Sequence, residues 1–274
     1  MTILDEIIAQ KRIEVEQRKL ATPASVLEQM PDFKRQPLSA RGAIQDLYST
    51  GIIAEFKRKS PSKGIINDQA DVSATTQGYV QAGAAVLSVL TDEPFFGGTP
   101  ADLQAARLAN PSTPILRKDF VIDPYQLLEA KAWGADLVLL IAACLTPADV
   151  AELSQQAQNL GMQVLLEVHD EDELDQTLTH TIDLVGVNNR NLKTFTTSID
   201  TSLRLVERIP DTFGKVTESG LHNAETMYAL FQAGFDGFLI GEAFMKTADP
   251  ATALRSIVTD FTSRMPTFAN SFTS

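Results

Sequence analysis

The chain has 274 residues, 44% of them hydrophobic, and a formal net charge of −12 at pH 7. The apolar content is enough for a large core, and the length suits one large domain or two ordinary ones. The acidic balance argues against a nucleic-acid or membrane partner, because both of these anionic surfaces favour a basic protein face.

The cysteine, histidine and apolar patterns exclude several further classes of protein. A lone cysteine, Cys144, cannot form an intramolecular disulfide, and its apolar neighbours at 139–145 favour a buried thiol over a nucleophile. Three scattered histidines show no zinc-binding spacing. The sequence shows neither a secretory signal nor an apolar run of the ~20 residues that a membrane helix needs. We therefore expect a soluble, cytoplasmic protein without a metal site.

Two helices are expected before the first strand. Apolar residues follow a helical spacing between 3 and 19, and Thr2 precedes them as a candidate cap. A shorter helix is expected at 24–30. Together they predict an N-terminal helical extension, residues 1–48, that could cover one end of the fold that follows.

The rest of the chain alternates between apolar segments and amphipathic stretches. Eight short segments rich in β-favouring residues lie at 51–56, 84–90, 114–118, 136–141, 163–168, 183–187, 213–218 and 237–241. Helical patterns separate them, which indicates parallel βαβ units. Eight such units fit a (β/α)8 barrel better than an open doubly wound sheet, which would carry a Gly-x-Gly-x-x-Gly motif after its first strand. We expect a single barrel domain over 1–274, with 1–48 as its extension.

Polar residues stand at the carboxyl ends of these segments, where a barrel places its catalytic groups. Glu55 and Lys57 are two positions apart at the end of the first segment, so they share one face of that strand. Later strand ends supply further polar residues, namely Lys118, Glu167, Asn188, Arg190, Glu218 and Ser219. Three carboxylates and two lysines are thus predicted to converge on one mouth. The alternative is that these charges only form a salt-bridge network at the rim.

The last two strand-to-helix loops suit a phosphate group. Ser219-Gly220 and Gly241-Glu242 each precede a helical pattern, and glycine lets the backbone come close to a ligand. Helix N-terminal N–H groups carry partial positive charge, which favours an anion. Ser60, in the loop after the first strand, could add a hydroxyl. The Glu242 carboxylate is expected to point to solvent while its N–H faces the ligand.

Two other segments allow more than one interpretation. The run 169–173 has a histidine and four acidic residues and could bind a metal, but acidic residues are also typical of a first helical turn, which is the favoured interpretation. The segment Phe95-Phe96-Gly97-Gly98 could be a lid or wall for an aromatic substrate, or could only pack on the barrel rim.

Six segments together carry a specific resemblance. They are 53–62, 116–120 with 123–126, 166–169, 186–195, 218–220 and 239–243. In this order they resemble the indole-3-glycerol-phosphate synthase family of tryptophan biosynthesis, whose N-terminal extension the chain also matches. Thr217 departs from the pattern, because a smaller residue is expected before the glutamate.

The resemblance implies a reaction without metal or cofactor. It is the ring closure, decarboxylation and dehydration of 1-(2-carboxyphenylamino)-1-deoxyribulose 5-phosphate to indole-3-glycerol phosphate. By position and analogy, Lys118 would be the acid at the ketone oxygen, with Glu167 and Lys57 serving the loss of water. Glu55 would orient the lysines. The remaining residues would bind and orient the substrate. Its sugar and carboxylate would contact Asn188, Arg190 and Glu218, and its phosphate would contact Ser60, Ser219, Gly220, Gly241 and Glu242. Phe120 and Leu239, which lie in the resembling segments, would also contact the substrate.

Two rival functions remain to be weighed against this one. A barrel of the phosphoribosylanthranilate-isomerase type would need a Cys–Asp pair at its strand ends, whereas the first strand offers Glu55 and Lys57. A catalytically silent phosphate-binding barrel would be expected to lack charged groups there. The expected partner is a phosphorylated small molecule, with neither nucleic acid nor membrane. A monomer is the default, and weak association with enzymes of the same pathway stays open.

Overall fold

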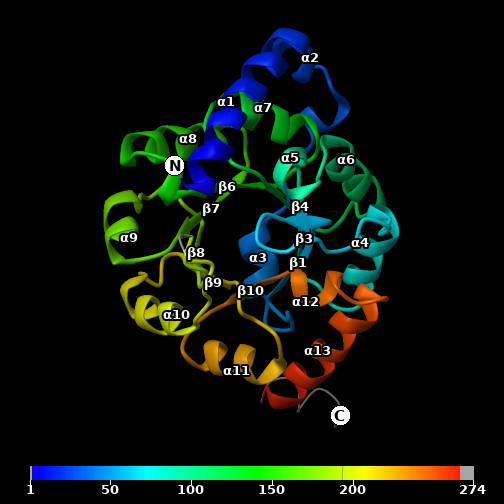
Figure 1. The fold of residues 1–274 in the computed structure, drawn as a ribbon, viewed down its shortest axis with the longest axis vertical. Coiled ribbons are helices and arrows are strands. Elements are labelled where there is room, and N and C mark those ends of the chain that lie inside the picture. The colour runs from blue at the N-terminus through cyan, green and yellow to red at the C-terminus, as the bar shows by residue number, and fades with distance from the viewer. Residues whose placement is uncertain (1, 193, 266–274) are drawn as a thin grey trace.

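Eight parallel strands close into a barrel around the centre of Figure 1, and most of the helices lie outside it. The computed structural model describes residues 2–192 and 194–265; Lys193, in one of the resembling segments, and 266–274 lie outside the described residues. Neighbouring strands follow the order β1-β10-β9-β8-β7-β6-β5-β4. Their bounds are β1 Ile52–Phe56, β4 Val86–Leu90, β5 Ile115–Lys118, β6 Leu137–Ile141, β7 Gln163–Val168, β8 Leu184–Asn188, β9 Gly214–Glu218 and β10 Gly237–Ile240. Each strand lies within two residues of a predicted segment, and the predicted (β/α)8 barrel is confirmed.

Alternate residues of each strand face the inside of the barrel. In β1, Ile53 belongs to the inner apolar cluster, whereas Ile52, Ala54 and Phe56 pack in the outer layer beneath the helices. Glu55, two residues after Ile53, lines the pocket at the barrel mouth. The inner positions are therefore apolar below and charged at the carboxyl end, which separates a packed core from a polar mouth.

Helices cover the outside of the barrel. The longer ones are α4 Val72–Gln81, α6 Pro100–Ala109, α7 Tyr125–Ala132, α8 Pro147–Asn159, α9 Glu171–Thr177, α10 Asp200–Leu205, α11 Ala224–Gln232 and α13 Pro250–Arg264. Shorter elements are α5 Glu93–Phe96, α12 Glu242–Met245, and the single 3-10 turns η1 Pro31–Lys34, η2 Ala142–Cys144 and η3 Val206–Arg208. Asn223 caps α11 as predicted, accepting from the Thr226 N–H. Among the described residues, no helix combines the length and apolar character needed to cross a bilayer.

The N-terminal extension folds into three helices, α1 Ile3–Ala21, α2 Ala24–Leu27 and α3 Ala40–Gln45. The first was predicted, and Thr2 caps it through a capping box with Asp5. The predicted second helix ends earlier than residue 30, because Met30 is extended (ψ 144°), as residues before proline prefer.

The extension covers both ends of the barrel rather than one. Ala40 and Ile44 of α3, a helix that was not predicted, join the inner apolar cluster. The start of α1 lies instead at the mouth, where Ile3, Leu4 and Ile7 line the pocket. The same stretch of chain thus closes the core and borders the site.

The loop after β1 is more ordered than its sequence suggested. It contains a two-stranded antiparallel ribbon, β2 Lys59–Ser60 and β3 Gly64–Ile65. Gly64, with φ 69°, adopts the left-handed conformation that a tight reversal needs. Ser60 is therefore held in a strand at the mouth and not on a free turn.

A buried ionic cluster fixes α1 to the barrel. Lys11 has no exposed side-chain surface, and its Nζ lies 2.8 Å from Asp92, 3.0 Å from Asp119 and 2.9 Å from Glu14. Burial opposes the charge of Lys11, but Asp119 and Asp92 outweigh it and raise its pKa. Asp119 directly follows Lys118, so the cluster joins the extension to a strand end at the mouth.

Replacing Lys11 should destabilise the fold strongly. Lys11→Met would leave Asp92 and Asp119 buried without their cation, an effect that typically costs about 3–5 kcal/mol. Urea unfolding would measure it, with Arg204→Met as the control, because Arg204 pairs with Glu171 at the exposed surface. Equal losses of unfolding free energy in both variants would contradict a central role for the cluster.

Candidate active site

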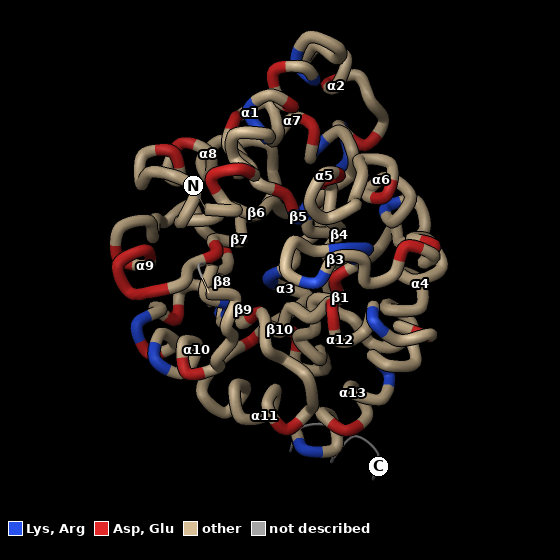
Figure 2. Tube along the Cα trace, viewed as in Figure 1, with Lys and Arg blue, Asp and Glu red and all other residues tan. Residues whose placement is uncertain are grey.

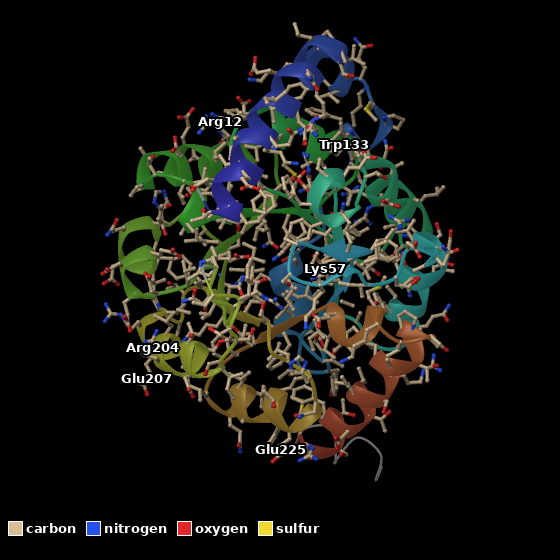
Figure 3. All side chains as sticks on the ribbon, viewed as in Figure 1. Arg12, Lys57, Trp133, Arg204, Glu207 and Glu225 are labelled. Atoms are coloured by element: carbon tan, nitrogen blue, oxygen red, sulfur yellow. The ribbon has the colours of Figure 1, made fainter. Side chains whose placement is uncertain are left out.

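One pocket at the carboxyl end of the barrel gathers every residue that the sequence singled out for the catalytic and substrate-binding site. It is lined by Glu55, Lys57, Ser60, Lys118, Phe120, Glu167, Asn188, Arg190, Glu218, Ser219, Gly220, Leu239, Gly241 and Glu242. Figure 3 labels Lys57, which lies near the centre of the ring of strands. The residues come from strand ends far apart in sequence, and barrel closure brings them together.

Lys118 is at the centre of the charged groups. Its Nζ lies 2.7 Å from Glu218 Oε2 and 3.2 Å from Glu167 Oε2, so one cation joins carboxylates from β7 and β9. Glu55 of β1 and Lys57, just after its end, form a second pair, 2.5 Å apart, as their spacing predicted. Asn188 donates to Glu167 Oε1 at 3.1 Å. The groups form a connected network of hydrogen bonds and ion pairs. Their pKa values distinguish a salt-bridge network from an acid–base site.

The two carboxyls on Lys118 differ in acidity. Burial, followed by the charge of Glu167, raises the pKa of Glu218 to about 7. Burial also disfavours the charged form of Glu167, but Lys118 and then His169 outweigh it and lower its pKa to about 2. Burial opposes the charge of Lys118 too, and Glu218, Glu167 and Glu55 together raise its pKa. Neighbouring carboxyls whose pKa values are shifted in opposite directions are typical of an acid–base site rather than of a salt-bridge network at the rim.

Apolar side chains form one wall of the pocket. The rings of Phe96 and Phe120 lie 5.9 Å apart between centroids and both line it, together with Ile3, Leu4 and Ile7 of α1. Phe96 belongs to the predicted aromatic segment, which forms the short helix α5 before Gly97. The α1 residues were not predicted, because their helical spacing does not tell which surface the helix covers.

Other parts of the pocket lining offer hydrogen-bond donors. The Ser60 hydroxyl is buried and has no hydrogen-bond partner among the described residues. Ser219 and Gly220 have φ of 68° and 79°, which turns the backbone sharply before α11. Gly241 precedes α12, whose first N–H groups have no intrahelical acceptor. Together these groups suit a small anion.

Glu242 differs from its prediction. Its carboxylate does not simply face solvent: its oxygens lie 3.7 Å from Arg190 Nη2 and 3.9 Å from Lys63 Nζ. Arg190 also donates to the Ser62 hydroxyl at 3.0 Å. The Glu242 side chain therefore connects three loops at the mouth, because two cations lie within reach of it.

Two residues noted in the sequence lie outside this constellation. Thr217 points away from the mouth, and its hydroxyl bonds Asn189 at 3.0 Å and Ser202 at 2.7 Å. Its departure from the family pattern thus leaves the pocket unchanged. Cys144 follows β6 in a 3-10 turn and is half-buried, and burial raises the pKa of its thiol.

No metal-binding group was found within 2–192 and 194–265. The acidic residues after His169 lie in the first turn of α9, as the favoured interpretation predicted, and Figure 2 shows them as a red segment of that helix. His169 itself lies against Glu167 and Glu173.

A (β/α)8 barrel with a pocket of buried charged groups, apolar side chains and free hydrogen-bond donors at its carboxyl end is typical of a barrel enzyme acting on a small molecule. The family model for indole-3-glycerol phosphate synthase matches residues 4–257. The chain therefore belongs to the indole-3-glycerol phosphate synthase family.

Named relatives agree with this assignment. An indole-3-glycerol phosphate synthase of Bacteroides thetaiotaomicron is 47% identical over 258 residues, which cover 93% of this chain and 97% of the relative. One of Salinibacter ruber is 46% identical over 255 residues, covering 93% and 94%. Among solved structures, 3-hexulose-6-phosphate synthase from Salmonella typhimurium is 16% identical with a TM-score of 0.62, over 78% of this chain and 100% of that one. This last likeness concerns the fold alone.

The different pKa values of Glu167 and Glu218 should be measurable by NMR. In protein labelled with 13C at glutamate carboxyls, one buried resonance should titrate near pH 7 and disappear in Glu218→Gln. Glu225→Gln, at an exposed position of α11, is the matched control and should leave the resonance in place. A wild-type spectrum in which all glutamates titrate near their ordinary pKa of about 4.3 would contradict the predicted acidity.

Proposed function

We propose that this chain is an indole-3-glycerol phosphate synthase that acts on 1-(2-carboxyphenylamino)-1-deoxyribulose 5-phosphate. The observation that carries the proposal is Lys118, a buried cation held between two carboxyls of different acidity in a pocket with an aromatic wall. Such a substrate has an aromatic ring with a carboxylate at one end and a phosphate at the other. The apolar wall suits the ring, and the Ser60 side of the pocket suits the phosphate.

The first step needs an acid at the ketone. The ring carbon that carries the carboxylate attacks the ketone carbon, and the ketone oxygen takes a proton and becomes a hydroxyl. Lys118 is proposed to donate that proton, because it is an ammonium group at the centre of the mouth. Loss of carbon dioxide from the attacked ring carbon then restores the aromatic ring.

The second step removes water. The hydroxyl leaves with a second proton, for which Lys57 is the proposed donor, and a base removes a substrate proton to form the double bond of the indole. Glu167 is the proposed base, because its low pKa keeps it ionised at neutral pH. Glu55, 2.5 Å from Lys57, would keep that lysine oriented. Asn188 and Glu218, which contact Glu167 and Lys118, would orient those two groups.

The substrate's two anionic ends are assigned to different groups of the pocket. Arg190 and Lys57 are proposed to bind the ring carboxylate before it leaves, and Phe120 and Leu239 to contact the substrate. Ser60, Ser219, Gly220 and the N–H groups at Gly241 and Glu242 are proposed to bind the phosphate, supported by the unpartnered Ser60 hydroxyl. Gly241 has a second requirement for glycine, because a Cβ there would lie 2.6 Å from Glu55 Oε1.

The rival functions find less support. An isomerase of the phosphoribosylanthranilate type would need a thiol at the end of β1, where Glu55 stands, and Cys144 follows β6 instead. A silent phosphate-binding barrel has no use for a buried carboxyl whose pKa is raised to about 7.

Turnover should depend on Lys118. The purified protein, incubated with the carboxyphenylamino-deoxyribulose phosphate and a chelator, should generate indole fluorescence, and Lys118→Met should lower kcat by ~10² or more. Lys246→Met, on the segment after α12, is the matched control. Turnover that survives Lys118→Met would move the acid role to Lys57, and a well-folded wild type without turnover would favour the silent barrel.

Phosphate recognition should depend on Ser60. Ser60→Ala should raise KM about tenfold or more while changing kcat little, since a hydrogen bond to a charged group contributes roughly 1.5–3 kcal/mol. Ser263→Ala, at an exposed position of α13, serves as control. With a substrate analogue that lacks the phosphate, Ser60→Ala and wild type should behave alike; a KM defect that persists with this analogue would place Ser60 at another part of the substrate.

A further inference from the structure

His169 lies directly behind the pocket and contacts Glu167, one of its charged groups. Its backbone N–H donates to Glu173 Oε2 at 2.8 Å, and its ring Nδ1 lies 3.0 Å from the same oxygen. Its other ring nitrogen, Nε2, lies 3.4 Å from Glu167 Oε1, is buried, and makes no hydrogen bond. The ring is thus held from outside by α9 and turned toward a proposed catalytic carboxylate.

Both ring nitrogens therefore face carboxylate oxygens. A neutral imidazole has one N–H and one lone pair, so one nitrogen would oppose a carboxylate with a lone pair. An imidazolium presents a proton to each oxygen. Burial lowers the pKa of His169, but Glu173 and Glu167 outweigh it, with a further contribution from Glu218, and the pKa is raised. The surroundings favour the charged ring.

The two carboxyls on Lys118 are not equivalent, and Lys118 does not explain the difference. Its Nζ is closer to Glu218 (2.7 Å) than to Glu167 (3.2 Å), which by itself would favour ionised Glu218. Glu167 nevertheless has the lower pKa. What distinguishes Glu167 is its other oxygen, Oε1, which accepts from Asn188 at 3.1 Å and faces His169.

The corresponding oxygen of Glu218 has no comparable hydrogen-bond donor beside it in the described part of the chain. Glu218 Oε1 is buried and makes no hydrogen bond within the described residues. Its near neighbour is Gly186, where even a Cβ would lie 3.2 Å from that oxygen. A buried carboxyl with one unsupported oxygen favours the protonated form. The asymmetry thus comes from the groups around the pair together with the interaction of the two carboxyls with each other.

We propose that His169 is a positioning residue: its imidazolium, held between Glu173 and Glu167, makes Glu167 rather than Glu218 the ionised carboxylate beside Lys118. The charged state of the ring follows from its contacts alone. The catalytic consequence, an ionised base at position 167 for the loss of water, rests on the proposed function.

The groups that face His169 come from four elements. Glu167 lies on β7, Glu173 on α9 and Glu218 on β9, and all three favour the imidazolium. Cys144, on η2, interacts with Glu167 and Glu173, but burial keeps its thiol neutral. Lys118, the cation of the site, lies on the far side of Glu167 and stabilises the same carboxylate.

Nitrogen NMR tests the charge without reference to activity. The chain has three histidines, so 15N-histidine labelling gives few signals, and His169→Gln and His180→Gln assign them. At pH 7 both ring nitrogens of His169 should carry protons, and the ring should titrate above its ordinary pKa of about 6.5. A neutral His169 ring at pH 7 would overturn the proposal, whatever the enzyme's activity.

Kinetics test the consequence. In His169→Gln the acid limb of the kcat–pH profile should move up by about one pH unit or more, with KM little changed, since one opposite charge near a carboxylate has an effect of that size. His180→Gln, at an exposed turn, should keep the wild-type profile. A kcat lowered equally at every pH in His169→Gln would assign His169 a merely structural role and overturn the proposal.

A second variant tests the proposal even if His169→Gln fails to fold. Glu173→Gln keeps a side chain beside Nδ1 without its charge, so it should lower the pKa of His169 and shift the acid limb in the same direction by less. Glu171→Gln, on the exposed side of α9, should do neither. An unchanged pKa of His169 in Glu173→Gln would overturn the proposal that Glu173 and Glu167 together stabilise the imidazolium. A wild type that carries the charged ring but turns over no substrate would refute the proposed function alone.

Discussion

The site depends on one shared cation in a place that water hardly reaches. Lys118 reaches from β5 to carboxyls on β7 and β9, and only 4–6% of those two carboxyl side chains is exposed. A buried charge without partners costs several kcal/mol, so the three groups require one another. They also require the closed barrel, because no two of these strands are neighbours in sheet order. The same side chains at the mouth therefore hold these strands together and carry the proposed chemistry.

The strand that carries Lys118 is held by charge on both of its faces. Lys118 points inward, whereas its neighbour Arg117 points outward and bonds Asp119 at 3.0 Å and Glu129 at 3.2 Å. Lys11 of α1 binds the same Asp119. Because side chains alternate along a strand, a few consecutive residues serve the inner site and the outer cluster at once. The N-terminal extension is thereby connected to the strand end that carries the proposed acid, as well as to the pocket wall.

Much of the fold could be predicted from local pattern, and the errors have physical reasons. Every barrel strand was predicted because a strand buried on both faces is a short apolar run between polar helices. The helix α3 was missed because Ala40 and Ile44 are only two apolar positions in a short segment, and their burial comes from the barrel end they cover. The pocket residues Ile3 and Leu4 were missed because an amphipathic face does not identify its partner. Glu242 was assigned to solvent because no local spacing links it to Arg190.

The sequence by itself determined which residues stand at strand ends and which of them face inward, because both follow from the period of two along a strand and the order of βα units. The tertiary structure alone decided how those residues act on one another. Glu167 and Glu218 are the same residue type at equivalent strand ends, yet one has its pKa lowered to about 2 and the other raised to about 7. Both carboxyls are buried to a similar degree, so the difference arises from their interaction with each other and from neighbours such as Asn188 and His169, whose positions only barrel closure fixes.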